Sequence, residues 1–381
     1  MAAFRTPLCE RLGLEVPVFA FSKAPAVVAE VSKAGGLGVL GAVAYTVDQL
    51  REALDWIDAH AGGRPYGVDV VMPVKYESAG AGHDGALDPK LLEQMISPKH
   101  RAFVEELLAR HEVPRLPEGE HGWHELLAWT EQTTRPQVEM VLSRTQSNIV
   151  LLANALGPPP ADIVDKAHAR GLVVAALSGS AAHAKKHIAN GVDVIVAQGT
   201  EAGGHCGEIS TMVLVPEIVD AVGDVPVLAA GGIGCGRQVA AALALGAQGA
   251  WTGSIWLTVA ESDVHPIAKD KLLRAKSTDT VRSRALTGKP ARQLKTAWSE
   301  AWDDPKGPGA LPMPLHWMAT AEATTRIHRF AETPGSRAHE LMTSPVGQIV
   351  GRMNESRPVA EVMKTIDDEL SVAMRRLSWR S

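Results

Sequence analysis

The sequence predicts an α/β protein of the (β/α)8 class, a TIM barrel with a helical insertion after strand 3 and a helical C-terminal extension. The first observation is that eight short runs rich in Val, Ile and Leu alternate with Ala-rich segments of helical periodicity. The second is that these runs are apolar on both faces, as parallel strands covered by helices are. Eight such units close most naturally into a barrel, with an open doubly wound sheet as the alternative.

The predicted strands are spaced along most of the chain, and a helical pattern follows most of them. The helix over residues 46–60 has a clear start, because Thr46 stands at a typical N-cap position. No longer sequence repeat recurs, so a solenoid is not indicated. The eight predicted strands are Val16–Phe21, Leu37–Gly41, Tyr66–Pro73, Asn148–Ala153, Leu172–Ser178, Asp193–Gly199, Val225–Gly232 and Gly249–Ser254.

The chain is longer than a barrel requires. A barrel takes about 250 residues, whereas this chain has 381. We expect the barrel to comprise residues 1–74 and 135–300, the insertion residues 75–134 and the extension residues 301–381. Both additional blocks are helical in pattern. They either form a helical lobe, a lid, over the barrel mouth, or they only brace its outer helices or make an oligomer contact.

Composition excludes several classes of protein. Hydrophobic residues at 45% and charged residues at 21% indicate a globular protein with a core. A formal net charge of −5 argues against a nucleic-acid partner. The sequence contains neither a signal-peptide core nor a long apolar run, so we expect a cytoplasmic protein without a membrane partner. Cys9, Cys206 and Cys235 are too widely spaced for a disulfide framework or a Cys-based zinc site.

The loop after the sixth predicted strand carries the strongest candidate for chemistry. In a barrel the active site lies at the carboxyl ends of the strands. His205 stands in this loop and is a candidate acid or base, with an ordinary loop histidine as the alternative. The glycines around it allow the backbone to lie flat against a planar ligand. They are Gly199, Gly203, Gly204 and Gly207.

The loops after the seventh and eighth predicted strands suggest a phosphate site. Gly231, Gly232 and Ile233 offer backbone N–H groups, and so do Gly253 and Ser254. Barrels commonly bind a phosphate here, at the start of a helix. Because no lysine accompanies these glycines and the GxxxxGK[ST] pattern is absent, we expect one phosphate monoester bound by amides.

Weaker candidates line the same mouth or lie outside it. Cys206 adjoins His205, but a catalytic thiol needs a base aimed at it. His121 and His124 lack a third metal ligand at suitable spacing, so we expect no metal. The segment 284–292 either reaches back to the ligand or bounds a helix. Further mouth candidates, each more often structural, are Ser22, Asp69, Ser178–Ser180 and Gln198.

Four segments, in order, resemble the nitronate monooxygenase/2-nitropropane dioxygenase-like flavoproteins. Residues 195–207 read IVAQGTEAGGHCG, close to the family's QGxEAGGHxG. The others are residues 31–41 (VSKAGGLGVLG), 225–254 and 286–292 (LTGKPAR). The resemblance implies a barrel that binds FMN noncovalently, with His205 as the catalytic base. The implied cofactor-binding residues are Ala20, Phe21, Ser22, Asp69, Gln198, Gly203, Gly204, Gly231, Gly232, Ile233, Gly253 and Ser254.

The chain departs from the family pattern at two places. Ala20 and Phe21 stand where relatives commonly have Gly-Gly or Gly-Met, and Asp69 stands where they have Asn. A carboxylate beside reduced FMN would repel its negative charge. Asp69 is therefore protonated, or points elsewhere, or the flavin potential is low. The lysine that enoyl-reductase and some quinone-reductase relatives carry after the fifth strand is absent, which favours the nitronate-oxidising branch.

The function expected from the resemblance is an FMN-dependent oxidoreductase that oxidises alkyl nitronates with O2 to a carbonyl compound and nitrite. One alternative is an NAD(P)H-dependent reductase of quinones or of unsaturated acyl-CoA or steroid-like compounds, which the extra helical blocks favour. Another is a barrel that binds ligands but has lost its chemistry. The partner is expected to be a small-molecule substrate, and the apolar C-terminal helices allow a homodimer.

Overall fold

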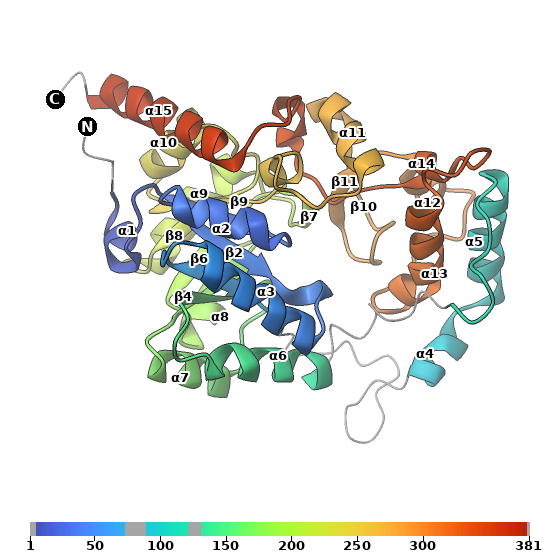
Figure 1. Cartoon of the computed structure of the whole chain (residues 1–381), viewed down its shortest axis with the longest axis horizontal. Coiled ribbons are helices and arrows are strands. Elements are labelled where there is room, and N and C mark those ends of the chain that lie inside the picture. The colour runs from blue at the N-terminus through green and yellow to red at the C-terminus, as the bar shows by residue number, and fades with distance from the viewer. Residues whose placement is uncertain (1–4, 73–88, 121–130, 379–381) are drawn as a thin grey trace.

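The computed structural model shows the closed eight-stranded TIM barrel that the sequence predicts (Figure 1). It describes residues 5–72, 89–120 and 131–378. All neighbouring barrel strands are parallel, and β1 closes the barrel by pairing Val18 with Ala250 of β9. The strands are β1 (Val18–Ser22), β2 (Leu37–Gly41), β3 (Tyr66–Asp69), β4 (Ile149–Asn154), β5 (Val173–Ser178), β6 (Val194–Gln198), β8 (Val227–Ala230) and β9 (Gly249–Thr252).

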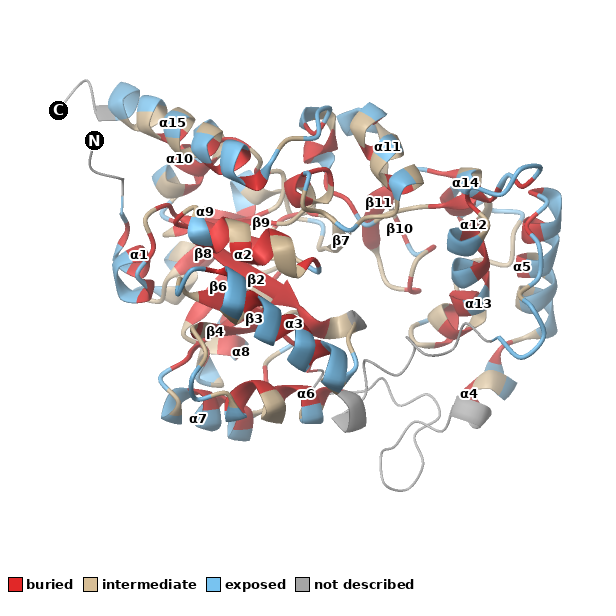
Figure 2. Ribbon diagram, in the orientation of Figure 1, coloured by how far each residue is buried: buried red, intermediate tan, exposed pale blue. Residues whose placement is uncertain are grey.

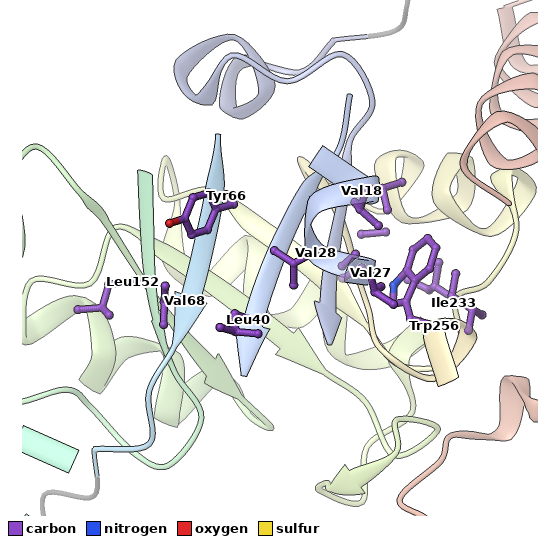
Figure 3. Close-up of a cluster of buried hydrophobic side chains, with 14 of the residues drawn as sticks. Val18, Val27, Val28, Leu40, Tyr66, Val68, Leu152, Ile233 and Trp256 are labelled. Carbon is purple, nitrogen blue, oxygen red and sulfur yellow. The ribbon is translucent and has the colours of Figure 1, made fainter. Parts of the chain in front are cut away.

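The strands are apolar on both faces because each face is buried. Phe19, Val39 and Leu151 belong to the cluster that fills the barrel interior. The alternate residues Leu40 and Leu152 belong to the larger cluster between the strands and the outer helices (Figure 3). This alternation fixes which side chains at the strand ends face the interior.

Helices surround the barrel and close one end. Thr46 accepts a hydrogen bond from the Gln49 N–H in a capping box, which confirms the predicted N-cap. Helix α1 (Pro7–Leu12) places Leu8 and Cys9 in the interior cluster. The outer helices are α2 (Pro25–Lys33), α3 (Val47–His60), α6 (Glu131–Ser143), α7 (Ala161–Ala169), α8 (Ala181–Ala189), α9 (Thr211–Val222) and α10 (Gly236–Ala244). The 3-10 turns are η1 (Ala42–Ala44), η2 (Ser254–Leu257), η3 (Ser277–Asp279) and η4 (Gln348–Arg352).

A second, smaller core forms a helical lobe at one side of the barrel (Figures 1 and 2). It buries Leu108 from the insertion against Trp298, Trp302 and Ile327 from the C-terminal part. The buried Arg326 joins the same two parts, donating to the carbonyl oxygens of residues 113 and 114. The helices of this region are α4 (Pro89–Met95), α5 (Pro98–Arg110), α11 (Pro266–Arg274), α12 (Ala297–Asp303), α13 (Leu315–Arg329) and α14 (Ala338–Leu341).

The end of the chain leaves this lobe and returns to the barrel. Helix α15 (Val359–Ser378) packs against α10 and α2. A Cβ on Gly236 would lie 2.1 Å from the carbonyl oxygen of Ile366, so the two helices touch through a glycine. The C-terminal extension is therefore divided: α12–α14 belong to the lobe, whereas α15 braces the outer ring. No helix in the described parts of the chain is long and apolar enough to cross a membrane.

A small antiparallel sheet, which the sequence did not predict, lies beside the barrel strands. Its order is β10 (Thr280–Ser283), β11 (Ala291–Leu294), β7 (Gly204–His205). The pairs Ala291–His205 and Arg292–Gly204 join a hairpin after the barrel to the glycine-rich loop that follows β6. Segments far apart in the sequence are thereby held together at the candidate site.

Candidate active site

His205 is held by the LTGKPAR segment. Its Nε2 lies 2.7 Å from Oγ1 of Thr287 in a hydrogen bond. The same Oγ1 accepts a hydrogen bond of 3.3 Å from the backbone N–H of Lys289. Because Ala291 pairs with His205 in the small sheet, both backbone and side-chain contacts fix the imidazole. Thr287 and Ala291 of this segment thus contact the candidate base, and contact of residues 284–292 with a ligand stays a prediction.

The surroundings of His205 keep its imidazole uncharged at neutral pH. Burial, followed by the positive charge of Lys289, lowers the pKa of His205 to about 4. An uncharged imidazole has a lone pair that can accept a proton. Within the described ranges Lys289 makes no ion pair, so its ammonium group can attract an anionic ligand to the same place.

The predicted phosphate loops meet in a space that only glycines fit. Gly231 and Gly232 adopt φ values of +108° and +70°, which side chains other than glycine rarely tolerate. A Cβ on Gly203 would lie 2.8 Å from the backbone nitrogen of Gly347. Ser254 accepts a hydrogen bond of 2.8 Å from that same Gly347 N–H through its Oγ. The loops after β6 and β9 are thus joined by Gly347, a residue of the C-terminal extension.

At Gly203 and Gly347 the backbones pack directly against each other, and the Gly347 N–H is already paired with Ser254 Oγ. A cavity of about 500 Å³ borders this glycine junction. Its walls include Gly231, Gly232, Glu201, Gln348 and Arg352. Of the predicted phosphate-binding residues, Gly231, Gly232 and Ile233 border this space, and a phosphate there stays a prediction.

Two backbone N–H groups at the start of α10, the helix after β8, have partners within the protein. The sequence predicts phosphate donors near this helix start. In the structure, Glu369 of α15 already occupies that helix start, accepting a 3.0 Å hydrogen bond from the Gly236 N–H. Gln238 likewise accepts from the Gly234 N–H at 2.9 Å. The Gly234 and Gly236 N–H groups are therefore already paired within the protein.

The residues at the end of β1 differ in what they offer. Ala20 belongs to the outer cluster, so only its backbone faces a ligand. Ser22 Oγ accepts from the Ala24 N–H at 3.1 Å and caps the following turn. The Phe21 ring fills the space beside Gly41, where a Cβ would lie 2.6 Å from a ring carbon. Phe21 thus brings an aromatic ring to the mouth where a smaller residue would leave room.

Asp69 ends β3 on the interior face of the barrel. Its neighbour Val68 lies in the outer cluster, so alternation turns the Asp69 side chain inward. It is 4% exposed, and burial raises its pKa from 3.8 to about 7. The Asp69 side chain therefore points into the barrel, and with a pKa of about 7 its carboxyl is only partly ionised at neutral pH.

The remaining predicted candidates serve other contacts or lie outside the described residues. Gln198 ends β6 beside Ala230 and is half-buried at the mouth. Ile233 is buried in the outer cluster, which leaves only its backbone for a ligand. Cys206 Sγ contacts the Thr200 carbonyl oxygen at 3.6 Å and is not aimed at by a base.

The other polar candidates also have structural roles. Ser178 Oγ donates to the Ser180 carbonyl oxygen at 2.8 Å, and Ser180 caps α8. His121 and His124 lie outside the described residues. Among those that are described, no group of three His, Cys, Asp or Glu side chains could hold a metal.

Sequence reasoning missed three residues of the site. Glu201 and Thr211 connect the histidine loop to the phosphate loop, and Gly347 completes the glycine junction. Glu201 lies inside the EAGGH motif, which is the signal that could have drawn attention to it. Gly347 is far along the chain in a segment without strand or helix periodicity, and only tertiary packing brings it into the site.

A TIM barrel with an imidazole on a glycine-rich loop after β6 is consistent with the class of flavin-dependent barrel oxidoreductases. The chain belongs to the nitronate monooxygenase family, whose model matches residues 14–369. A Mycobacterium tuberculosis protein provisionally named as a monooxygenase is 49% identical over 370 residues, covering 96% of each chain. A Staphylococcus aureus protein provisionally named as a nitronate monooxygenase is 29% identical, covering 97% of this chain and 98% of the relative.

Two solved structures are similar to this chain over almost its whole length. FabK from Thermotoga maritima is 26% identical with a TM-score of 0.71, covering 99% of this chain and 100% of that chain. Nitroalkane oxidase from Streptomyces ansochromogenes has a TM-score of 0.76 at 24% identity, covering 98% of this chain and 100% of that chain. At that identity, the second likeness shows the shared fold.

Proposed function

We propose that this chain is an FMN-dependent enzyme that oxidises alkyl nitronates with O2, giving a carbonyl compound and nitrite. The observation that carries the proposal is the position of His205, uncharged and oriented by Thr287, next to the glycine loops that are expected to bind a phosphate. The family supports the reaction class, and the M. tuberculosis and S. aureus relatives carry names of the same kind.

FMN is the flavin that we expect, because the glycine loops suit one phosphate monoester held by amides. The backbone N–H groups of Gly231, Gly232, Gly253 and Ser254 would hold that phosphate. The ring would then lie across the strand ends near Phe21 and Asp69. When bound, FMN would supply a two-electron acceptor that oxygen can reoxidise.

The side chains supply proton transfer and substrate attraction. His205 would take the α-proton of a neutral nitroalkane, a general-base step that contributes about 10²–10⁴-fold. The pKa of about 4 makes the free imidazole a weak base. The anionic nitronate formed beside it would stabilise the imidazolium and raise its basicity during the step. Lys289 would hold the anion, and Thr287 would keep the ring in position.

The test is spectroscopic and then chemical. Purified protein should show a flavin absorbance spectrum, and heat should release FMN. Incubation with alkyl nitronates in air should then yield nitrite. Flavin-loaded protein that produces no nitrite from a series of nitronates would contradict the proposed reaction. Colourless protein that stays colourless after incubation with FMN would support the alternative of a barrel that has lost its chemistry.

A second candidate function is the NAD(P)H-dependent reductase. The helical lobe beside the barrel favours this function, because a large substrate needs a larger binding surface than a nitronate does. The likeness to FabK points the same way. Anaerobic mixing of the flavin-loaded protein with NADH and with NADPH distinguishes the two: rapid flavin bleaching supports the reductase, and none supports the oxidase.

A further inference from the structure

Asp69 is a buried acid without a local partner. It is 4% exposed and faces the barrel interior at the carboxyl end of β3. The flanking strands place Gly41 and Ala153 directly beside it, and neither has a side chain that can form a hydrogen bond. Within the described ranges, the Asp69 carboxyl takes part in no ion pair and no side-chain hydrogen bond. Burying such a carboxyl costs free energy unless a ligand forms the hydrogen bonds that the protein does not supply.

No charged group on the elements packed against β3 stabilises the buried carboxyl of Asp69. The elements packed against β3 are β2, β4, η1 and α2. The first three contain no titratable residue. In α2, Glu30 and Lys33 form an ion pair with each other at the surface. Burial alone acts on the acid, and burial disfavours its charged form.

A neutral carboxylic acid differs from a carboxylate because it has an O–H donor. At the mouth of the barrel such a donor can serve a carbonyl oxygen or ring nitrogen at the polar edge of a flavin. A carboxylate there would meet those acceptors with like charge. We propose that Asp69 binds the flavin ring as a neutral carboxylic acid, so that flavin binding by this chain takes up one proton from solvent whenever the acid is ionised beforehand. This inference rests on the flavin site of the proposed function, although not on the nitronate reaction.

The proton balance gives a direction for the pH dependence. At acidic pH the acid already carries its proton, so the affinity for flavin does not change with pH. At alkaline pH the free protein must first gain a proton from solvent. The dissociation constant then rises as pH rises, by up to about tenfold per pH unit for one coupled proton.

The experiment measures riboflavin and FMN binding to flavin-free full-length protein from pH 5.5 to 9, by quenching of flavin fluorescence. Riboflavin is included because it lacks the phosphate, whose own ionisation would otherwise contribute. For the parent protein we expect the dissociation constant of riboflavin to be constant below neutrality and to rise above it. Asp69→Asn, which keeps the shape and stays neutral, should bind with little dependence on pH.

A second measurement uses the parent protein alone, in case Asp69→Asn does not fold. Calorimetric titration with riboflavin at pH 8.5, in buffers of different ionisation enthalpy, reports proton uptake directly. We expect close to one proton per flavin bound at pH 8.5 and none at pH 5.5. Uptake of no proton, or equal pH dependence in parent and variant, overturns the inference while the nitronate reaction stands. Failure of the parent to bind either flavin at any pH overturns the flavin site and this inference together.

Discussion

The carboxylate of Glu201 holds the first residue of α9, Thr211, by two hydrogen bonds. Its Oε2 lies 2.9 Å from the backbone nitrogen of Thr211 and 2.8 Å from its Oγ1. The same Oγ1 lies 3.0 Å from the carbonyl oxygen of Gly231. Since Glu201 belongs to the loop that carries His205 and Gly231 to the phosphate loop, this pair ties the candidate base to the candidate phosphate site.

Replacing Thr211 with Val should weaken the connection between the loop of Glu201 and the loop of Gly231. The variant keeps the shape but removes the hydroxyl, and a hydrogen bond to a charged group contributes about 1.5–3 kcal/mol. We expect a lower midpoint of thermal unfolding and weaker FMN binding, measured by fluorescence. Thr211→Ser retains the hydroxyl and serves as the control. Unchanged FMN affinity in Thr211→Val would show that the two loops hold their positions independently.

Gly347→Ala should disturb the glycine junction. A Cβ there would lie 2.5 Å from the Glu201 carbonyl oxygen and 3.2 Å from Ser254 Oγ, so the backbone must shift. Overpacking of this kind costs about 1–3 kcal/mol. FMN should bind more weakly, while riboflavin, which lacks the phosphate, should lose less affinity. Equal losses for the two flavins would instead indicate a general folding defect, which the unfolding midpoint of the flavin-free protein would register.

His205→Asn tests the assignment of the base. The variant should retain flavin, because other residues are expected to hold its phosphate. Turnover of neutral nitroalkanes should fall by about 10²–10⁴-fold, whereas substrates supplied as nitronates should lose much less, since they need no deprotonation. Initial rates of nitrite formation with both forms of one substrate measure the difference. Parallel losses with the two forms would remove the role of general base.

Lys289→Met should weaken recognition of anionic substrates. Loss of one charge near the reacting group at intermediate effective dielectric is worth roughly 1–2 kcal/mol, or about tenfold in KM for a nitronate. The pKa of His205 should also rise, because the charge of Lys289 lowers it. The pH profile of nitroalkane oxidation should therefore shift upward. Lys289→Arg keeps the charge and should behave like the parent; if it resembles Lys289→Met, geometry rather than charge is responsible.

The barrel could be predicted from sequence because its signals are local. The run Leu37–Gly41 is apolar on both faces and becomes β2, and Thr46 with Gln49 caps the following helix through residues three positions apart. Helix α9 escaped prediction because it is apolar on most sides and contains Pro216, which disguises a helical period.

The site could be predicted only in part, because its supports are distant in sequence. His205 and the glycine loops were identifiable from their motif and from the order of strands. The pairing of Gly204 with Arg292 rests on strands of two and four residues, too short to show a pattern. Gly347 meets Gly203 only because the chain returns from the lobe to the barrel. Burial, which sets the properties of Asp69, is likewise a product of the whole fold.

His316 should make the protein sensitive to acid. Its side chain is buried in the lobe, where Nε2–H donates to the Ala285 carbonyl oxygen at 3.0 Å and the ring packs against Trp302. Burial lowers the pKa of His316 from 6.5 to about 4. The unfolded chain binds this proton first, so stability is lost as pH falls from 6.5 through 4, by at most about 3 kcal/mol.

His316→Gln should remove this part of the acid sensitivity. Denaturant unfolding of the parent and the variant at pH 7.5 and pH 4.5 gives the two free-energy differences. We expect the difference between the two pH values to be smaller in the variant than in the parent, even if the variant is less stable at both. His339→Gln, at an exposed histidine of the same lobe, should leave the difference unchanged. If the free energy of unfolding falls with acid as steeply in the variant as in the parent, protonation of His316 does not destabilise the folded protein.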